Sequence, residues 1–537
     1  MTTPPRIRTI PTPLYGRGSE SGASMTCSRS GSTLFTSTTQ NLTGSSKSQR
    51  RRRAMQNERP TALTRRSLLK LAGGAAASAM LPIRLGLAAD TSFVMTQLSA
   101  YMSDAGNRTL PGEVIEKAKH HIVDTFAAMI SGAELPPGRA AIQFARAYGG
   151  DKVATVAASK VLCGPMEAAL ANGVLAHADE TDDSWPGGWH PGCNVVPAAL
   201  ALGERFGISG TRFLRAVALG YDVGARVLMT LRPGLAETHK STHSIAGVFG
   251  AAAAAGCAAN LNAQQMRWLL DYTAQQSSGV AGWYRDTDHI EKGFVFGGMP
   301  ARSGVTSALL VQSGWTGIDD ILSGDDNFLM ANMPHGNAAQ IIDKLGERYE
   351  ITQTNIKKWT VGSPIQAPLD ALEIMLKRRP FEAEQVREVA VRMNPGNVTD
   401  NREMPDICIQ HMIAVMLLDK TVTFRSAHDK PRMKDPSVLR HRAKVRLEPE
   451  AGSGRGNAAR QPLVVVTLAD GTHLSEDVTA VLGTVNNPMT RDQVVTKCRD
   501  LMAPVLGAAA TAKLIGATLD LENLKNVREL RPLLQRA

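Results

Sequence analysis

The chain has 537 residues, of which 43% are hydrophobic and 20% are charged. This length exceeds what one hydrophobic core usually supports, so two domains are expected, and the composition excludes a disordered or fibrous protein. The net charge of +11 lies at the front: residues 1–90 hold 14 of the 60 Lys and Arg residues but only three of the 49 acidic ones. The neutral remainder lacks the basic surface that binds phosphate backbones, so nucleic acid is excluded as a partner.

The first 90 residues predict a leader and an export signal. Residues 1–54 are rich in Ser, Thr, Gly and Arg without apolar periodicity, and we expect them to be disordered or to precede the true start. Residues 55–90 contain the motif TRRSLLK at 64–70, an apolar run at 71–81 and a pair of alanines at 88–89. This resembles a bacterial twin-arginine signal, which predicts a periplasmic protein; the alternative is a basic tail on a cytoplasmic protein. The apolar run is too short to span a bilayer, so no stable membrane insertion is expected.

Residues 91–345 predict a helical domain. Val114, Ala118, Ile122 and Phe126 form an apolar i, i+4 stripe. Almost wholly apolar helices belong in the middle of a bundle, and apolar helices are expected at residues 165–178, 196–206, 211–230, 245–259 and 301–313.

Residues 346–488 have a different pattern, which predicts a smaller α/β domain. Strand-like alternation occurs at 386–393 and 443–450, and the strands 463–468 and 473–481 are joined through Asp470-Gly471. Asp-Gly between two such runs indicates a hairpin, because that turn needs positive backbone angles. In the last segment, residues 489–537, a helix over 490–506 is expected to pack back on the first domain.

The six cysteines are scattered, with no CxxC pair and no close Cys/His cluster, so no metal site is expected. Five of them follow residue 90, and an odd number argues against a complete disulfide framework. Buried free thiols are therefore predicted.

The densest polar cluster is an expected loop between two helices, residues 177–192 (HADETDDSWPGGWHPG). Its four carboxylates within five residues repel one another, which requires cations, protonation or exposure. A solvated acidic loop is the alternative interpretation. Trp, His, Gly and Pro around the carboxylates favour a fixed functional loop instead.

Two further segments offer cations. Residues 239–244 (HKSTHS) precede an Ala-rich helix, and residues 285–292 (RDTDHIEK) precede the segment 297–304 (GGMPARSG). Backbone N–H groups at helix starts favour anions, so a di- or tricarboxylate would suit these places. The candidate binding residues are Lys240, His243 and Arg302; the alternative is that each is a surface or capping residue.

Several motifs in this order resemble the MmgE/PrpD family, over about residues 92–504. They are ANGV at 171–174 leading into His177 and the DDS of 182–184, the pair His190-Pro191, GVFGAA at 247–252, the segment 292–304, and NPMT at 487–490 with Lys497. The resemblance implies a mainly α fold with a large all-helical domain and a smaller α/β lid domain. It also implies a homodimer whose active site uses neither metal nor cofactor.

The resemblance carries specific roles to this chain. It places a catalytic carboxylate, hydroxyl and histidine on Glu180, Ser184 and His190, where Glu stands in place of the usual Asp and Ser in place of a common Thr. A family lysine matches Lys292, but its segment is one residue longer than in the decarboxylases of the family and has Phe296 where they have histidine. This departure argues against decarboxylase activity. Lys240 lies near another family lysine without being in strict register.

The predicted function is a cofactor-independent dehydratase for a small di- or tricarboxylate, similar to 2-methylcitrate. Glu180 or His190 would move the proton beside a carboxylate, Lys292 and Arg302 would hold carboxylates, and Ser184 would donate a hydrogen bond. One alternative is an epimerase or decarboxylase on the same scaffold. Another is an exported polycarboxylate-binding protein without turnover, against which the clustering of Glu180, Asp182 and His190 speaks.

Overall fold

The computed structural model describes residues 91–536 except for 236–237, 333–335, 394–401 and 450–462. The predicted leader and export signal, residues 1–54 and 55–90, lie outside the described residues. Helices dominate the described part of the chain and the strands form only small sheets, which confirms a mainly α fold.

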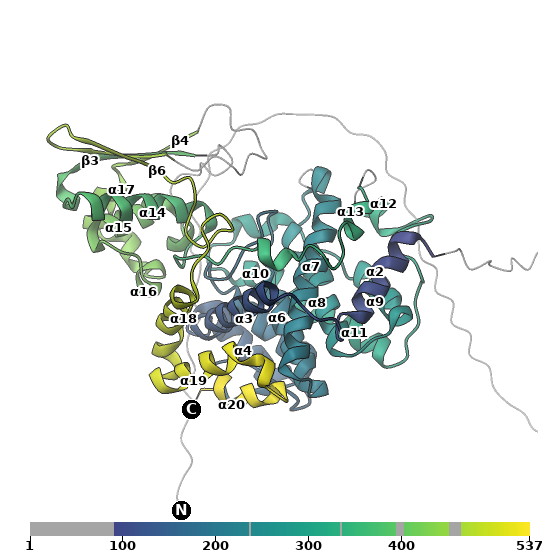
Figure 1. Ribbon diagram of the computed structural model, residues 1–537. Helices are drawn as coiled ribbons and strands as arrows, with labels where there is room; N and C mark the ends of the chain where they lie inside the picture. The colour runs from purple at the N-terminus through teal and green to yellow at the C-terminus, as the bar shows by residue number, and fades with distance from the viewer. Residues whose placement is uncertain (1–90, 236–237, 333–335, 394–401, 450–462, 537) are drawn as a thin grey trace, which may run out of the picture. The chain divides into compact units, whose positions relative to one another are not determined.

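The first hydrophobic core surrounds helix α8 (Thr242–Ala258), in which every residue from Ser244 to Ala258 is buried. Figure 1 shows α8 among other helices. The prediction that this Ala-rich helix lies in the middle of a bundle is confirmed, because it contacts α6 (Gly192–Phe206), α7 (Gly210–Leu235) and α11 (Met299–Gln312). The other longer helices before residue 300 are α2 (Phe93–Asp104), α3 (Gly112–Gly132), α4 (Pro136–Tyr148), α5 (Pro165–Ala176) and α9 (Ala263–Gln275).

Helix α5 touches the short π-helix η3 (Phe294–Gly298) backbone to backbone. A Cβ atom on Gly173 would lie 2.5 Å from the carbonyl oxygen of Gly297, so only glycine permits this approach. α10 (Ile290–Gly293), η3 and α11 follow one another without a break. Among the described helices, only this combined stretch is long and apolar enough to cross a membrane, and 61% of its apolar window is buried inside the protein.

A second core lies under a four-stranded sheet of order β4-β3-β5-β6. The strands are β3 (Val386–Met393), β4 (Val445–Pro449), β5 (Leu463–Leu468) and β6 (His473–Asp477). β3 runs parallel to β4 and antiparallel to β5, and β5 pairs antiparallel with β6. Helices α14 (Ser363–Arg378) and α15 (Ile409–Asp419) pack against the sheet (Figure 1).

The strand predictions for 386–393 and 463–468 are confirmed, whereas β4 and β6 are shorter than predicted. The Asp470-Gly471 hairpin is also confirmed. Within its described loop only Gly471 takes a positive φ, +87°. The N–H of Leu468 donates to the carbonyl of Thr472 and closes the loop.

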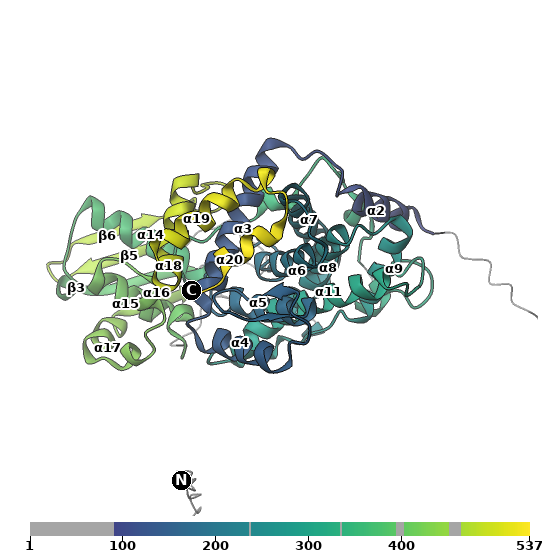
Figure 2. The ribbon, with the colours of Figure 1, turned by 90° about the horizontal axis from the view of Figure 1, so that it is seen from below.

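The C-terminal segment returns to the first core, as predicted for residues 490–506. Helix α18 (Arg491–Leu506) begins at a capping box made by Thr490 and Gln493, and it packs against α3. Figures 1 and 2 both show α18 and the following α19 (Ala508–Leu519) beside α3, although more than 350 residues separate them in sequence.

Candidate active site

The acidic loop joins α5 to α6 and is buried, so the interpretation of a solvated loop is wrong. Asp179, Glu180, Asp182 and Asp183 are each at most 4% exposed. Four buried carboxylates require compensation by cations or hydrogen bonds. Each of the four has its own set of partners.

Asp182 lies between two histidines. Its Oδ2 is 3.0 Å from Nδ1 of His177, and its Oδ1 is 3.0 Å from Nδ1 of His190. Burial by itself raises the pKa of Asp182, but the two imidazoles hold it well below its usual value, so the group is a carboxylate. Burial also lowers the pKa of His177 to about 4 despite Asp182, so its ring is neutral at pH 7. With Nδ1–H donated to Asp182, Nε2 of His177 carries a lone pair that can accept a proton.

Glu180 lies between two lysines. Nζ of Lys292 donates to Oε1, and Nζ of Lys357 is 2.6 Å from the backbone oxygen of Glu180 and 3.4 Å from Oε2. His289 adds its Nε2 at 3.5 Å from Oε1. Burial raises the pKa of Glu180, but the charges of Lys292 and Lys357 outweigh burial and lower it well below the usual value. The loop therefore presents a carboxylate to two buried ammonium groups.

The ring of Phe296 packs against two histidines of the site. Phe296 of η3 stacks on His177 with ring centroids 4.6 Å apart and on His243 with centroids 3.7 Å apart. The His243 ring also lies 5.3 Å from that of His190. Burial lowers the pKa of His243 well below its usual value, so this ring is neutral as well. Two neutral histidines thus share one phenyl ring beside the charged groups.

Asp183 connects the loop to three neighbouring helices. Asp183 accepts hydrogen bonds from the Tyr221 hydroxyl at 2.6 Å and from the Gly192 N–H at 2.8 Å, and its Oδ2 lies 2.6 Å from Nδ1 of His121. Asp183 therefore fixes the start of α6 relative to α3 and α7.

Lys497 of α18 adds a contact from the C-terminal helices. Its Nζ lies 2.6 Å from Oδ1 of the buried Asp124 and donates to the backbone oxygen of Thr181 at 3.0 Å. Because α18 belongs to the last fifty residues, the loop is held by chain segments from both ends of the described part.

The structure brings together most of the residues predicted for the site. Those that share the buried cluster are Glu180, Asp182, His190, Lys292 and His243. Ser184 lies half-buried at the edge of the same loop, where its backbone pairs with Asn355.

Two predicted binding residues do not join the cluster. Nζ of Lys240 lies 2.8 Å from Oδ1 of Asn332 in α12 (Phe328–Asn332), and Arg302 is exposed on α11. The segment 285–292, which is predicted to precede a helix start, does so only as far as His289. The helix begins at Ile290, with His289 at its N-cap in a left-handed conformation (φ 66°), and Lys292 lies within it.

Three residues of the cluster have no role predicted from the sequence: His177, His289 and Lys357. His177 opens the acidic loop and His289 lies in the segment that was expected to bind anions, so a signal existed for both. Lys357 is 177 positions from Glu180 and stands in no motif. Only the folded chain reveals it.

One group in the described residues has the spacing of metal ligands: His177, Asp182 and Cys193, whose ligand atoms lie within 4.8 Å of one another. Burial raises the pKa of the Cys193 thiol well above its usual value, and its Sγ is 3.2 Å from the backbone oxygen of His190. A metal ligand must be a thiolate, so this trio fits a metal poorly. All five described cysteines are buried and free, as predicted.

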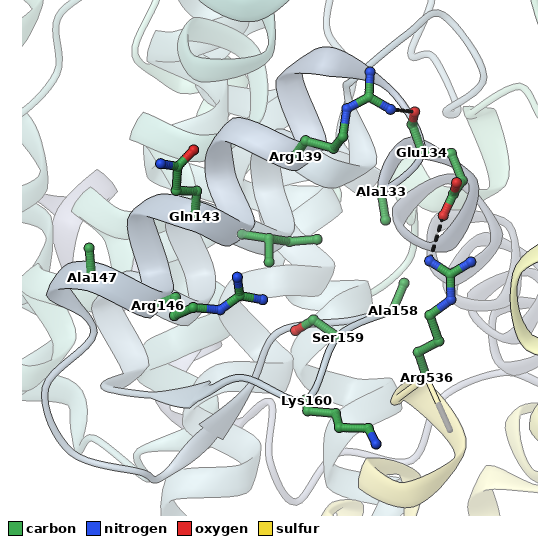
Figure 3. Close-up of a pocket in the computed structure, with 11 residues that line it drawn as sticks. Ala133, Glu134, Arg139, Gln143, Arg146, Ala147, Ala158, Ser159, Lys160 and Arg536 are labelled. Carbon is green, nitrogen blue, oxygen red and sulfur yellow. Dashed lines mark hydrogen bonds and ion pairs between the residues drawn. The ribbon is translucent and has the colours of Figure 1, made fainter. Parts of the chain in front are cut away.

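A separate pocket, with a volume of about 910 Å³, carries a basic rim (Figure 3). Arg139 and Arg146 of α4, Lys160 and Arg536 surround it. Its acid, Glu134, forms an ion pair with Arg536 at 2.8 Å. This pocket can attract an anion, but none of its lining residues is a histidine and its carboxylate is already paired. The buried cluster around Asp182, rather than this pocket, is therefore the candidate active site.

Both regions of the chain are similar to known proteins. Residues 96–340 match the MmgE/PrpD N-terminal domain, and residues 359–522 match the MmgE/PrpD C-terminal domain. The chain is 22% identical over 477 residues to cis-aconitate decarboxylase of Aspergillus terreus, covering 82% of this chain and 96% of the relative. It is 24% identical to the cis-aconitate decarboxylases of Mus musculus and Homo sapiens, covering 79% of this chain and 89% and 91% of those relatives. The chain belongs to the MmgE/PrpD family of enzymes.

Proposed function

We propose that this protein is a cofactor-independent lyase that removes a proton beside a carboxylate of a small di- or tricarboxylate and expels a hydroxyl group. The observation that carries the proposal is the sharing of Asp182 by His177 and His190, next to two buried lysines. A carboxylate that orients an imidazole by its Nδ1 leaves Nε2 for proton transfer.

The histidines and the lysines have different roles in this proposal. His190 is 8% exposed whereas His177 is fully buried, so His190 is the group that reaches substrate, and His177 shares its carboxylate. One imidazole accepts the carbon-bound proton, and a protonated group must then donate to the departing hydroxyl. Lys292 and Lys357 supply the positive charge that stabilises a substrate carboxylate and the negative charge that forms beside it.

Decarboxylation is the second candidate, because the named relatives are cis-aconitate decarboxylases. Loss of CO2 leaves the same kind of carbanion, which the lysines would stabilise and a histidine would protonate. Phe296, which stands where the family's decarboxylases have histidine, favours dehydration over this alternative.

The proposal extends to the assembly and location of the protein. We regard residues 346–488 as a lid, because Lys357 and His428 from this region both contact the acidic loop. A homodimer follows from the family resemblance, and periplasmic export from the twin-arginine motif.

The test is to incubate the purified protein with hydroxy, amino and unsaturated di- and tricarboxylates in deuterated water and to follow the products by NMR. Formation or hydration of an alkene supports the dehydratase. Deuterium incorporation without elimination indicates an epimerase, and CO2 release indicates a decarboxylase. Binding without exchange would refute an enzyme for these substrates. Arg146→Gln, in the basic pocket of Figure 3, is the control and should leave turnover unchanged.

A further inference from the structure

His428 makes a contact that the proposed chemistry does not use. It follows the short helix α16 (Phe424–Ala427), outside the helical core that carries the acidic loop. Its Nε2 lies 3.0 Å from Oδ2 of Asp179, and its Nδ1 lies 2.6 Å from the backbone oxygen of Phe424. A carbonyl oxygen and a carboxylate both accept hydrogen bonds and donate none. The carbonyl oxygen requires a hydrogen on Nδ1, and the carboxylate charge of Asp179, 3.0 Å from Nε2, favours a second one there, so His428 is assigned as an imidazolium.

Asp179 in turn shapes the backbone around Glu180. It accepts hydrogen bonds from the N–H of Thr181 at 3.0 Å and from the Thr181 hydroxyl at 2.5 Å. These bonds hold the residues on both sides of Glu180 in a fixed turn. Asp179 is 1% exposed, so its charge requires a cation nearby, and His428 is that cation.

We propose that the His428 imidazolium is a positioning residue, which holds Glu180 between Lys292 and Lys357 by way of Asp179. The proposal rests on the proposed function, because Glu180 belongs to its site. It predicts that turnover depends on the protonation of a histidine that never touches substrate.

The charged groups that face His428 are Asp179, from the loop, and Asp406, from the segment before α15. Burial lowers the pKa of His428, but the ion pair with Asp179 and the charge of Asp406 outweigh burial and raise the pKa from 6.5 to about 8. Burial raises the pKa of Asp406, whose Oδ2 is 3.6 Å from Nε2 of His289.

The sign of the pH effect follows from this raised pKa. The imidazolium contributes fully below pH 6.5, and its contribution is lost as the pH rises through about 8. The wild-type kcat should therefore decline above about pH 8.

The experiment compares His428→Gln, which cannot be charged, with His428→Lys, which keeps a cation through this range. We expect kcat to fall at least tenfold in His428→Gln and to lose its decline near pH 8, whereas His428→Lys recovers part of the rate and moves the decline to higher pH. His441→Gln is the control, because His441 lies near Glu384 and Lys444 rather than the loop. A His428→Gln variant with the wild-type rate and the wild-type pH profile would overturn the proposal.

A second measurement does not depend on turnover. NMR titration of the protein with labelled histidine, with His428→Gln used to assign the signal, should give a pKa near 8 for His428 and a lower value in Asp179→Asn. A pKa of 6.5 or below would overturn the positioning role even if the substrate stays unknown. A pKa near 8 in a protein inactive on every carboxylate would instead count against the proposed function alone.

Discussion

Replacing Asp182 with Asn tests the central feature of the site. The side chain keeps its shape, but one oxygen that accepts from an Nδ1–H, 3.0 Å away, becomes an NH2 donor. The imidazole that faces the NH2 must then turn its Nδ1 into an acceptor and protonate Nε2, so it can no longer take a proton there. The other imidazole keeps its tautomer but loses the negative charge that stabilises its protonated form. General acid–base catalysis contributes about 10²- to 10⁴-fold, so kcat should fall by that factor. KM should change little, because Lys292 and Lys357 stay in place.

Steady-state rates and urea unfolding of Asp182→Asn and Asp183→Asn distinguish a loss of catalysis from a loss of stability. Asp183 contacts no residue of the proposed proton transfer; it accepts from Tyr221 and Gly192. Asp183→Asn keeps only one of the oxygens that face Tyr221, Gly192 and His121, so the free energy of unfolding should fall by about 2–4 kcal/mol. We expect the larger loss of kcat in Asp182→Asn. If Asp182→Asn retains more than a tenth of the wild-type kcat, the role assigned to the shared carboxylate is refuted.

Four further changes have defined outcomes. Lys357→Met leaves Glu180 with one ammonium partner fewer, so the free energy of unfolding should fall by about 3–5 kcal/mol in urea unfolding, and KM should rise. Unchanged stability would show that the buried pair is dispensable. Phe296→His should increase CO2 release from cis-aconitate, detected by NMR; an unchanged product would remove Phe296 from reaction choice. Gly173→Ala should lower the free energy of unfolding by about 1–3 kcal/mol, because its Cβ meets the η3 backbone. Gly516→Ala, whose Cβ faces open space, is the control and should not. Equal unfolding midpoints for the two variants would contradict the close contact between α5 and η3. Replacing the arginines of residues 65–66 with Lys should keep the protein in the cytoplasm, checked by cell fractionation; periplasmic recovery would reject the export signal.

Much of the fold follows from local pattern. A continuous apolar run marks α8, and strand alternation with an Asp-Gly turn marks β5 and β6, because these signals depend on neighbours in sequence. Helix starts were less accurate. Residues 192–195 of α6, for example, follow the acidic loop directly and carry no capping signal, since the N-cap Pro191 makes no side-chain hydrogen bond.

The candidate site was predictable in part for a related reason. Glu180, Asp182 and His190 lie in one short loop, so their composition exposes them. The lysines that contact this loop come from far along the chain: Lys357 pairs with Glu180, and Lys497 binds the backbone oxygen of Thr181. Their separation in sequence gives no sign of these contacts. Arg302 shows the converse, because a charged residue near a motif faced solvent once the helix formed.

The π-helix η3 determines which side chains of the following helix face the site. A π turn holds one residue more than an α turn, so the helix after it is rotated by about 100° relative to the helix before it. Lys292 precedes this turn and is buried, whereas Arg302 follows it and is exposed. Deleting one residue of η3 would turn a different side chain toward His177 and His243. In this scaffold, the gain or loss of a single residue should change which side chain contacts the histidines, without any substitution among the histidines themselves.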